Sequence, residues 1–167
     1  MSAQSLDDLL AIEAIRQLKA RYCRFVDTKQ WDRLAGVFAP GARLDGLGSA
    51  PDGSDAATFV AGISKRLARV ISIHHVHNPE ITITGPGIAQ GIWPMMDYLE
   101  FPADERPSEA PESRGFVGYG FYEEEYRKVG DTWLIAHLRL TRMRVDALAQ
   151  DHPLPRFGRH KPSPDWL

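Results

Sequence analysis

The chain has 167 residues, of which 43% are hydrophobic and 25% are charged, and its formal net charge is -2 at pH 7. This length suits one domain with one sizeable core. The small net charge offers no overall attraction to nucleic acid or anionic lipid, so we expect no binding to either. The sequence contains no run of about 18 apolar residues, so we expect no membrane-spanning segment, and the N-terminus lacks the basic and apolar regions of a signal peptide. The single cysteine, Cys23, excludes an internal disulfide and favours a reducing, cytoplasmic location.

The N-terminal part of the chain follows a helical pattern. Apolar residues recur at helical spacing from Leu6 to about Val26, which predicts a long first helix. The segment 31–38 places its large apolar side chains on one side of a short second helix. After a loop, Ser54 or Asp55 can cap a third helix that runs to Val70.

The periodicity changes after the third helix, where β-branched residues and alternating polarity predict strands. The predicted strands cover residues 73–84, 88–101, 115–128 and 132–144, with a short additional one at 43–47. The last two form a hairpin joined at a Val-Gly-Asp turn. We expect the polar, proline-rich segment 102–114 to be an exposed loop. Glu123, Glu124 and Glu125 have the composition of a solvated strand end.

The order of these elements, helices first and long antiparallel strands afterwards, is that of an α+β fold and not of alternating βαβ units. An antiparallel sheet with helices on one side can enclose a cavity between the two layers. We expect one α+β domain over residues 1–145. Residues 146–167 carry four prolines and are expected to form an irregular tail.

Three stretches of the chain resemble a known family. They read AIEAIRQLKARYCRFVDTKQWDRLAGVFAPGARLD, HHVHNPEITITG and GYGFYEEEYRKVGDTWLIAHLRL, and the resemblance spans roughly residues 9–145. They look like the SnoaL-like branch of the nuclear-transport-factor-2-like superfamily. The resemblance implies a cone-shaped, curved antiparallel β-sheet packed by three N-terminal helices around a pocket. It also implies a homodimer or homotrimer, since relatives bury the outer sheet face between subunits.

The family resemblance is less specific for the reaction. Relatives include scytalone dehydratase, a bile-acid 7α-dehydratase, a hexachlorocyclohexane dehydrochlorinase, ketosteroid isomerase, polyketide cyclases, and members that only bind or scaffold. Fold alone therefore fixes no activity. The aspartate that serves as the base in ketosteroid isomerase has no evident counterpart in this chain, which disfavours that reaction.

The resemblance also implies catalytic residues. In the dehydratase and dehydrochlorinase relatives, an aspartate at the end of the first helix orients a histidine from the strand after the third helix. Asp27 stands at the matching place, and the histidine is His74 or His75. Only one of the two can face the pocket, because side chains alternate along a strand. Counting back from Asn78 favours His74. Tyr22 sits where the bile-acid dehydratase has a functional tyrosine, although it could equally be a core residue.

Four further residues are candidates for substrate binding. Asp97 lies near the position of a further acidic residue in the bile-acid enzyme. Arg139 matches a pocket arginine on the last strand, and His137 is its rival. Trp93 and Met96 lie on opposite faces of the predicted strand, so either the tryptophan lines the pocket and the methionine packs behind it, or the reverse.

A histidine held by a carboxylate suits proton abstraction. Histidine has an unperturbed pKa of about 6.5 and is largely neutral near pH 7, and a carboxylate on its other nitrogen fixes the tautomer. We therefore expect a cofactor-free, dehydratase-like lyase or an isomerase acting on a small, largely apolar cyclic substrate. The alternatives are a small-molecule-binding or scaffold protein, and a purely structural dioxygenase small subunit.

Neither a cofactor nor a metal is expected. The chain shows no Gly-rich nucleotide loop and no P-loop. His75 and His77 share a strand face and could chelate, but no further Cys or His occurs at zinc-site spacing.

Overall fold

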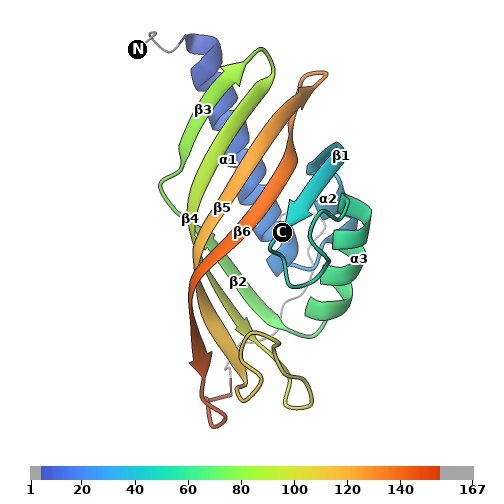
Figure 1. Ribbon diagram of the computed structural model, residues 1–167, viewed down its shortest axis with the longest axis vertical. Helices are drawn as coiled ribbons and strands as arrows, with labels where there is room; N and C mark the ends of the chain where they lie inside the picture. Colours follow the sequence, from blue (N-terminus) through green and yellow to red (C-terminus); the bar gives the residue numbers. More distant parts are fainter. Residues whose placement is uncertain (1–4, 155–167) are drawn as a thin grey trace.

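Three helices and six strands make up residues 5–154, the part of the chain that the computed structural model describes (Figure 1). The helices are α1 (Leu6–Asp27), α2 (Trp31–Ala35) and α3 (Ala56–Leu67). The strands are β1 (Phe38–Asp45), β2 (Ile71–Val76), β3 (Glu80–Gly85), β4 (Ile88–Glu100), β5 (Gly115–Val129) and β6 (Thr132–Leu148). None of the helices in these residues is long and apolar enough to cross a membrane.

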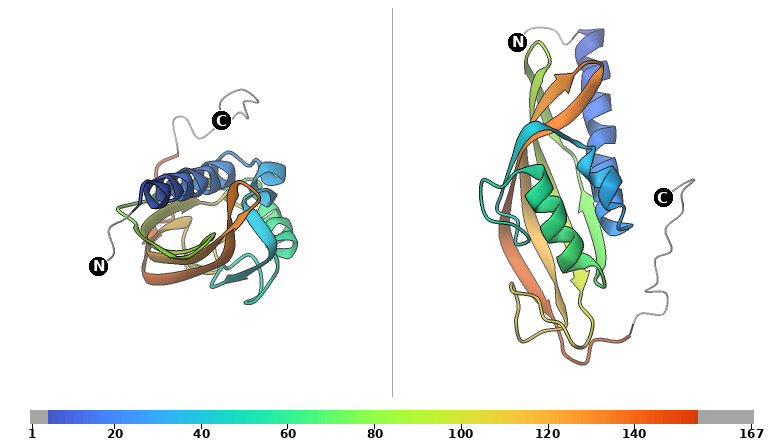
Figure 2. Two further views of the ribbon diagram at one scale, coloured as in Figure 1. Left: turned by 90° about the horizontal axis from the view of Figure 1, so that it is seen from above. Right: turned by 90° about the vertical axis from the view of Figure 1, so that its right-hand side faces the viewer.

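The strands form one curved, unclosed sheet in the order β1-β6-β5-β4-β2, with β3 paired to the other end of β4. All neighbours are antiparallel except β1, which runs parallel to β6. The sequence predicted only antiparallel pairing. β1 differs from this prediction. It is far from β6 in the sequence and is not joined to it by a hairpin, so no tight turn requires the two strands to be antiparallel. Figure 2 shows the sheet curving around an interior that α1 covers.

The helices pack into the concave side of this sheet. α1 contacts β2, β3 and β6, and α3 contacts β1 and α2. Ser5 and Asp8 form a capping box that begins α1, and Asp27 ends it. The side chain of Asp55 accepts a hydrogen bond from the backbone N–H of Thr58 at 2.8 Å, so Asp55 is the residue that caps α3. An α+β cone with three N-terminal helices is thus the observed fold.

Several predicted boundaries change. The strand predicted over 73–84 is two strands, interrupted at residues 77–79, and both of them pair with β4. Pro79 has no backbone N–H to give to a ladder, which accounts for the break. The last strand continues to Leu148, and residues 155–167 of the predicted tail lie outside the described part of the chain.

Two segments predicted to be solvated are partly or fully covered. In the segment 102–114, Pro107 and Ser113 are buried. Glu124 is only 3% exposed, because alternation along β5 turns it to the concave side between outward-facing Glu123 and Glu125. Composition alone does not distinguish these three glutamates, whereas the pleat does.

Candidate functional site

Asp27 and His74 are joined by two hydrogen bonds. One carboxylate oxygen, Oδ2, accepts the backbone N–H of His74 at 2.7 Å, and Oδ1 lies 2.6 Å from Nδ1 of the ring. A carboxylate only accepts, so Nδ1 carries the proton and Nε2 of the neutral ring is unprotonated. The contact predicted between Asp27 and one of two histidines is made by His74. His75 is exposed on the opposite face of β2 beside His77, with ring centroids 6.3 Å apart.

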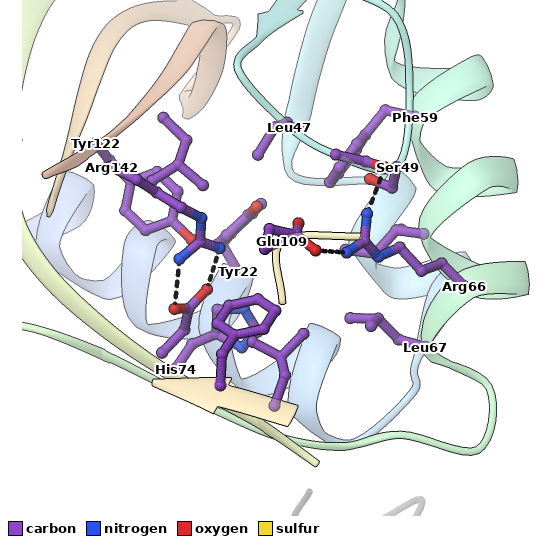
Figure 3. Close-up of a pocket in the computed structure, with 16 residues that line it drawn as sticks. Tyr22, Leu47, Ser49, Phe59, Arg66, Leu67, His74, Glu109, Tyr122 and Arg142 are labelled. Atoms are coloured by element: carbon purple, nitrogen blue, oxygen red, sulfur yellow. Dashed lines mark hydrogen bonds and ion pairs between the residues drawn. The ribbon is translucent and has the colours of Figure 1, made fainter. Parts of the chain in front are cut away.

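The ring of His74 borders a small cavity of about 50 Å³ inside the cone (Figure 3). Its side chain is only 8% exposed. The wall is mainly apolar and aromatic, and includes Leu47, Phe59, Ile63, Leu67, Leu99 and Phe116. Helix α3, the loop after β1 and strands β4 and β5 supply these residues, so the space lies between the helical layer and the sheet.

A carboxylate and a guanidinium form a second polar pair on the cavity wall. Asp97 is the residue directly opposite His74 in the β2/β4 ladder, so both point inward. Arg142 of β6 donates to both of its oxygens, at 2.6 and 2.5 Å. The pair crosses β5 at Gly118, where a Cβ would lie 1.8 Å from Nη1 of Arg142 and 2.3 Å from Oδ1 of Asp97. Only glycine leaves room for this contact.

The Asp97 contact fixes the charge of Arg142. Burial alone would lower the pKa of this guanidinium, but the hydrogen bonds and the charge of Asp97 outweigh it and raise the pKa. Arg142 is therefore a permanent cation that can position or stabilise negative charge but cannot donate a proton in a reaction.

Two tyrosines complete the inner wall. Tyr22 of α1 and Tyr122 of β5 are buried, with ring centroids 6.0 Å apart. Burial raises the pKa of both hydroxyls well above the ordinary value. Both phenols thus keep their protons and can act as neutral hydrogen-bond donors toward a bound molecule.

Trp93 lies on the concave face but outside the cavity wall. Its Nε1 donates to the hydroxyl of Tyr126 at 2.7 Å, and Tyr126 in turn donates to Glu124. Glu124 also pairs with Lys19 of α1. Trp93 therefore belongs to a buried network behind the cavity, while Met96 faces the outer side of β4.

The prediction that Arg139 or His137 lines the cavity is corrected by the structure. Arg139 is exposed on the outer face, where it makes two 2.7 Å bonds to Glu123. His137 lies 2.6 Å from Asp45 through Nε2, and this hydrogen bond lowers the pKa of the Asp45 carboxyl. Both line a surface hollow of about 410 Å³ and not the inner cavity.

A β-bulge explains this correction. Ile135 faces inward, and an uninterrupted strand would turn the residues two and four positions later inward as well. The register shifts at Ala136, which has no partner on β5, so the inward set becomes Leu138, Leu140 and Arg142. The sequence does hold a signal for Arg142, because it shares the parity of those two leucines.

Arg66 and Glu109 form a third polar pair on the cavity wall. Nη2 of Arg66 donates to Glu109 at 2.5 Å, and Nη1 donates to the carbonyl oxygen of Gly48 at 2.5 Å. Figure 3 shows this pair on one side of the cavity and Arg142 with its partner on the other. Nothing in the sequence patterns singles out either residue, since Arg66 lies at a helix end and Glu109 in an irregular segment.

Comparisons with known proteins agree with the fold. Residues 7–139 match the model of the SnoaL-like domain. The chain is 29% identical over 148 residues to Probable cyclase FGR4 of Gibberella zeae, covering 80% of this chain and 91% of that protein. It is similar in structure to hexachlorocyclohexane dehydrochlorinase LinA-type3 from Novosphingobium barchaimii, with TM-score 0.69, 21% identity, and coverage of 90% and 98%. The Kfla4162 protein from Kribbella flavida gives TM-score 0.68, 19% identity, and coverage of 80% and 91%. The chain therefore belongs to the SnoaL-like family.

Proposed function

We propose that the protein is a cofactor-free lyase, dehydratase-like, or an isomerase, and that it removes a proton from a small, largely apolar cyclic substrate. The observation that carries this proposal is the hydrogen bond between Asp27 and Nδ1 of His74 at the wall of the inner cavity. It leaves Nε2 as a free base, buried and aimed by a fixed partner.

The remaining wall residues fit an elimination. Nε2 of His74 takes the proton from a carbon next to the leaving group, and Asp27 stabilises the imidazolium that forms. The C–H electron pair becomes the new double bond as the C–O bond breaks. The leaving hydroxyl receives the proton from the imidazolium and departs as water. The phenols of Tyr22 and Tyr122 can donate to the developing negative charge on oxygen, and the cation of Arg142 lies on the same wall.

The relatives support this class of reaction. The LinA-type3 neighbour is named a dehydrochlorinase, and loss of HCl from adjacent carbons is an elimination that also needs a base. The FGR4 relative is named a probable cyclase. By analogy with these relatives, we propose proton abstraction at carbon as the step that this chain catalyses.

One observation favours a second candidate, a scaffold protein with a vestigial pocket and without turnover. The cavity of about 50 Å³ is smaller than the roughly 300–1,000 Å³ of pockets that take organic ligands. A catalytic protein must open this space, whereas a vestigial pocket need not.

Hydrogen–deuterium exchange distinguishes the two. Cyclic ketones and β-hydroxyketones would be incubated with the protein in D₂O and followed by NMR for exchange at carbon and for loss of water. We expect exchange by the native protein and a loss of at least about 100-fold in His74→Ala. His75→Ala is the matched control and should retain the rate. Exchange that survives His74→Ala, or ligand binding with no exchange at all, would refute the proposed reaction.

A further inference from the structure

Arg66 lies between two spaces. Its side chain, 19% exposed, lines the inner cavity of about 50 Å³ and also a surface hollow of about 560 Å³ outside it. Glu109 lines the inner cavity and is hydrogen-bonded to Arg66 (Figure 3). Because Arg66 lines both spaces, a molecule moving from the hollow to His74 passes beside this ion pair.

The two partners are held in different ways. Arg66 projects from α3, and its bond to the Gly48 carbonyl keeps the guanidinium in place without Glu109. Glu109 belongs to the segment 101–114 between β4 and β5, which contains no helix or strand. Apart from Arg66, its carboxylate accepts one bond, from the hydroxyl of neighbouring Ser108 at 3.0 Å. Glu109 can thus leave with its segment while Arg66 stays.

The size of the cavity requires such a movement. A space of about 50 Å³ holds no more than a few water molecules. A cyclic substrate that reaches His74 must displace part of the wall, and the parts of the wall without helix or strand are the loop after β1 and the segment 101–114. Displacement of the segment 101–114 takes the carboxylate of Glu109 away from Arg66.

The charges on the wall indicate what then replaces that carboxylate. The guanidinium groups of Arg66 and Arg142 face two carboxylates, Asp97 and Glu109. Asp97 is fully engaged by the two-bond contact with Arg142. Without Glu109, Arg66 is a largely buried cation with free N–H donors, and such a group needs an anionic partner. A guanidinium is well matched to a planar carboxylate.

We propose that Arg66 binds a carboxylate of the substrate, and that Glu109 occupies this place in the free protein. The substrate class that follows is a small cyclic carboxylate whose acidic C–H reaches Nε2 of His74. That the bound carboxylate is a substrate rests on the proposed function, while the anion site itself is independent of any reaction.

Two isosteric probes test the anion site. Cyclohexanecarboxylate and cyclohexanecarboxamide have nearly the same shape and differ in charge. Their affinities would be measured by NMR titration, following the backbone resonances of Gly48 and of residue 66. We expect Glu109→Gln to bind the carboxylate at least about tenfold more tightly than the native protein, because the competing charge is gone. Arg66→Gln should remove the preference for the carboxylate over the carboxamide.

Asp104→Asn is the matched control. It removes a carboxylate from the same segment, but Asp104 pairs with exposed Arg69 at 2.9 Å, away from the residues that line the cavity. Its carboxylate affinity should equal that of the native protein. Equal binding of the two probes by Glu109→Gln, a preference that survives Arg66→Gln, or no carboxylate binding by Glu109→Gln at about 10 mM would each overturn the inference.

His74→Ala separates this inference from the proposed reaction. That variant should bind the carboxylate with the affinity of the native protein, since Arg66 and Glu109 are unchanged. If His74→Ala keeps the exchange activity while Arg66→Gln loses the probe preference, the reaction is refuted and the anion site stands. If His74→Ala loses the exchange activity while Arg66→Gln keeps the probe preference, the role of His74 as base stands and the proposed substrate class is wrong.

Discussion

Lys19 and Glu124 form an ion pair from which solvent is fully excluded, with both side chains 0% exposed. The Nζ of Lys19 also lies 3.4 Å from the ring centroid of Tyr122 and 4.2 Å from that of Tyr22. One cation thereby links the end of the cavity, formed by two tyrosines, to the network behind it.

Removal of one partner of this pair should destabilise the protein strongly. Lys19→Met leaves a buried carboxylate unpaired, and we expect a loss of about 3–5 kcal/mol in the free energy of unfolding, measured by urea denaturation. The double variant Lys19→Met with Glu124→Gln should recover much of that loss. Arg139→Ala, which breaks an exposed pair, is the control and should change stability far less. A small effect of Lys19→Met alone would contradict a charged, buried pair.

The two contacts of Asp27 predict what its amide would do. In Asp27→Asn the side-chain oxygen can still accept the backbone N–H of His74, and the NH₂ group then faces Nδ1. Because the NH₂ group only donates, the ring should switch to the tautomer with its proton on Nε2. Long-range ¹⁵N NMR of the imidazole reads this directly. The Nδ1–H tautomer in both proteins would show that the contact does not control the ring.

The burial of Lys29 predicts that the free energy of unfolding increases with pH in the alkaline range. Burial lowers its pKa to about 8 from the ordinary 10.5, although Asp27 opposes the shift. Between these values the unfolded chain binds more protons than the folded protein, so the free energy of unfolding contributed by this group increases with pH. Its share is up to about 3 kcal/mol across the window. Below pH 8 both states are charged and the burial penalty is present in full.

Lys29→Gln should flatten that rise. The variant keeps a long polar side chain near Ser72, to which Lys29 donates at 2.7 Å, but it has no charge to bury. Urea unfolding of both proteins at several values from about pH 8 to about pH 10.5 gives the difference in slope. Parallel pH profiles would mean that Lys29 is not buried as a cation.

The outer face of the sheet predicts self-association. Ile73, Ile92 and Tyr119 on β2, β4 and β5 are 43%, 42% and 38% exposed, and half-buried Phe121 lies on the same face. Apolar side chains gathered on an exposed strand face need cover. We expect a homodimer or homotrimer in sedimentation at micromolar concentration, and its dissociation by Tyr119→Glu. Arg16→Glu on α1 is the control. A native monomer under these conditions would refute the prediction.

Periodicity in the sequence was enough to predict the helices, the final hairpin and the α+β order, because these depend on local alternation of apolar and polar residues. The contact between Asp27 and His74 followed from the family resemblance, which includes the position of the histidine relative to Asn78. Arg66 and Glu109 could not be predicted in this way. They meet because a helix end and an irregular segment 43 residues apart fold onto the same cavity wall, and no local pattern encodes that encounter.

The bulge at Ala136 has a consequence for how the inner wall can change. Two sets of side chains alternate along β6 beyond it: Leu138, Leu140 and Arg142 face in, and His137, Arg139 and Thr141 face out. Deletion of Ala136 should remove the bulge and leave both sets in place, because Ile135 and His137 already pair with consecutive residues of β5, Tyr126 and Glu125. A chain shortened by this single codon would thus keep its wall of two leucines and an arginine. Deletion of a residue elsewhere in this part of the strand would instead turn every following side chain to the other face, so the bulge is the place between Ile135 and Arg142 where β6 can lose a residue without a change in the chemistry of the wall.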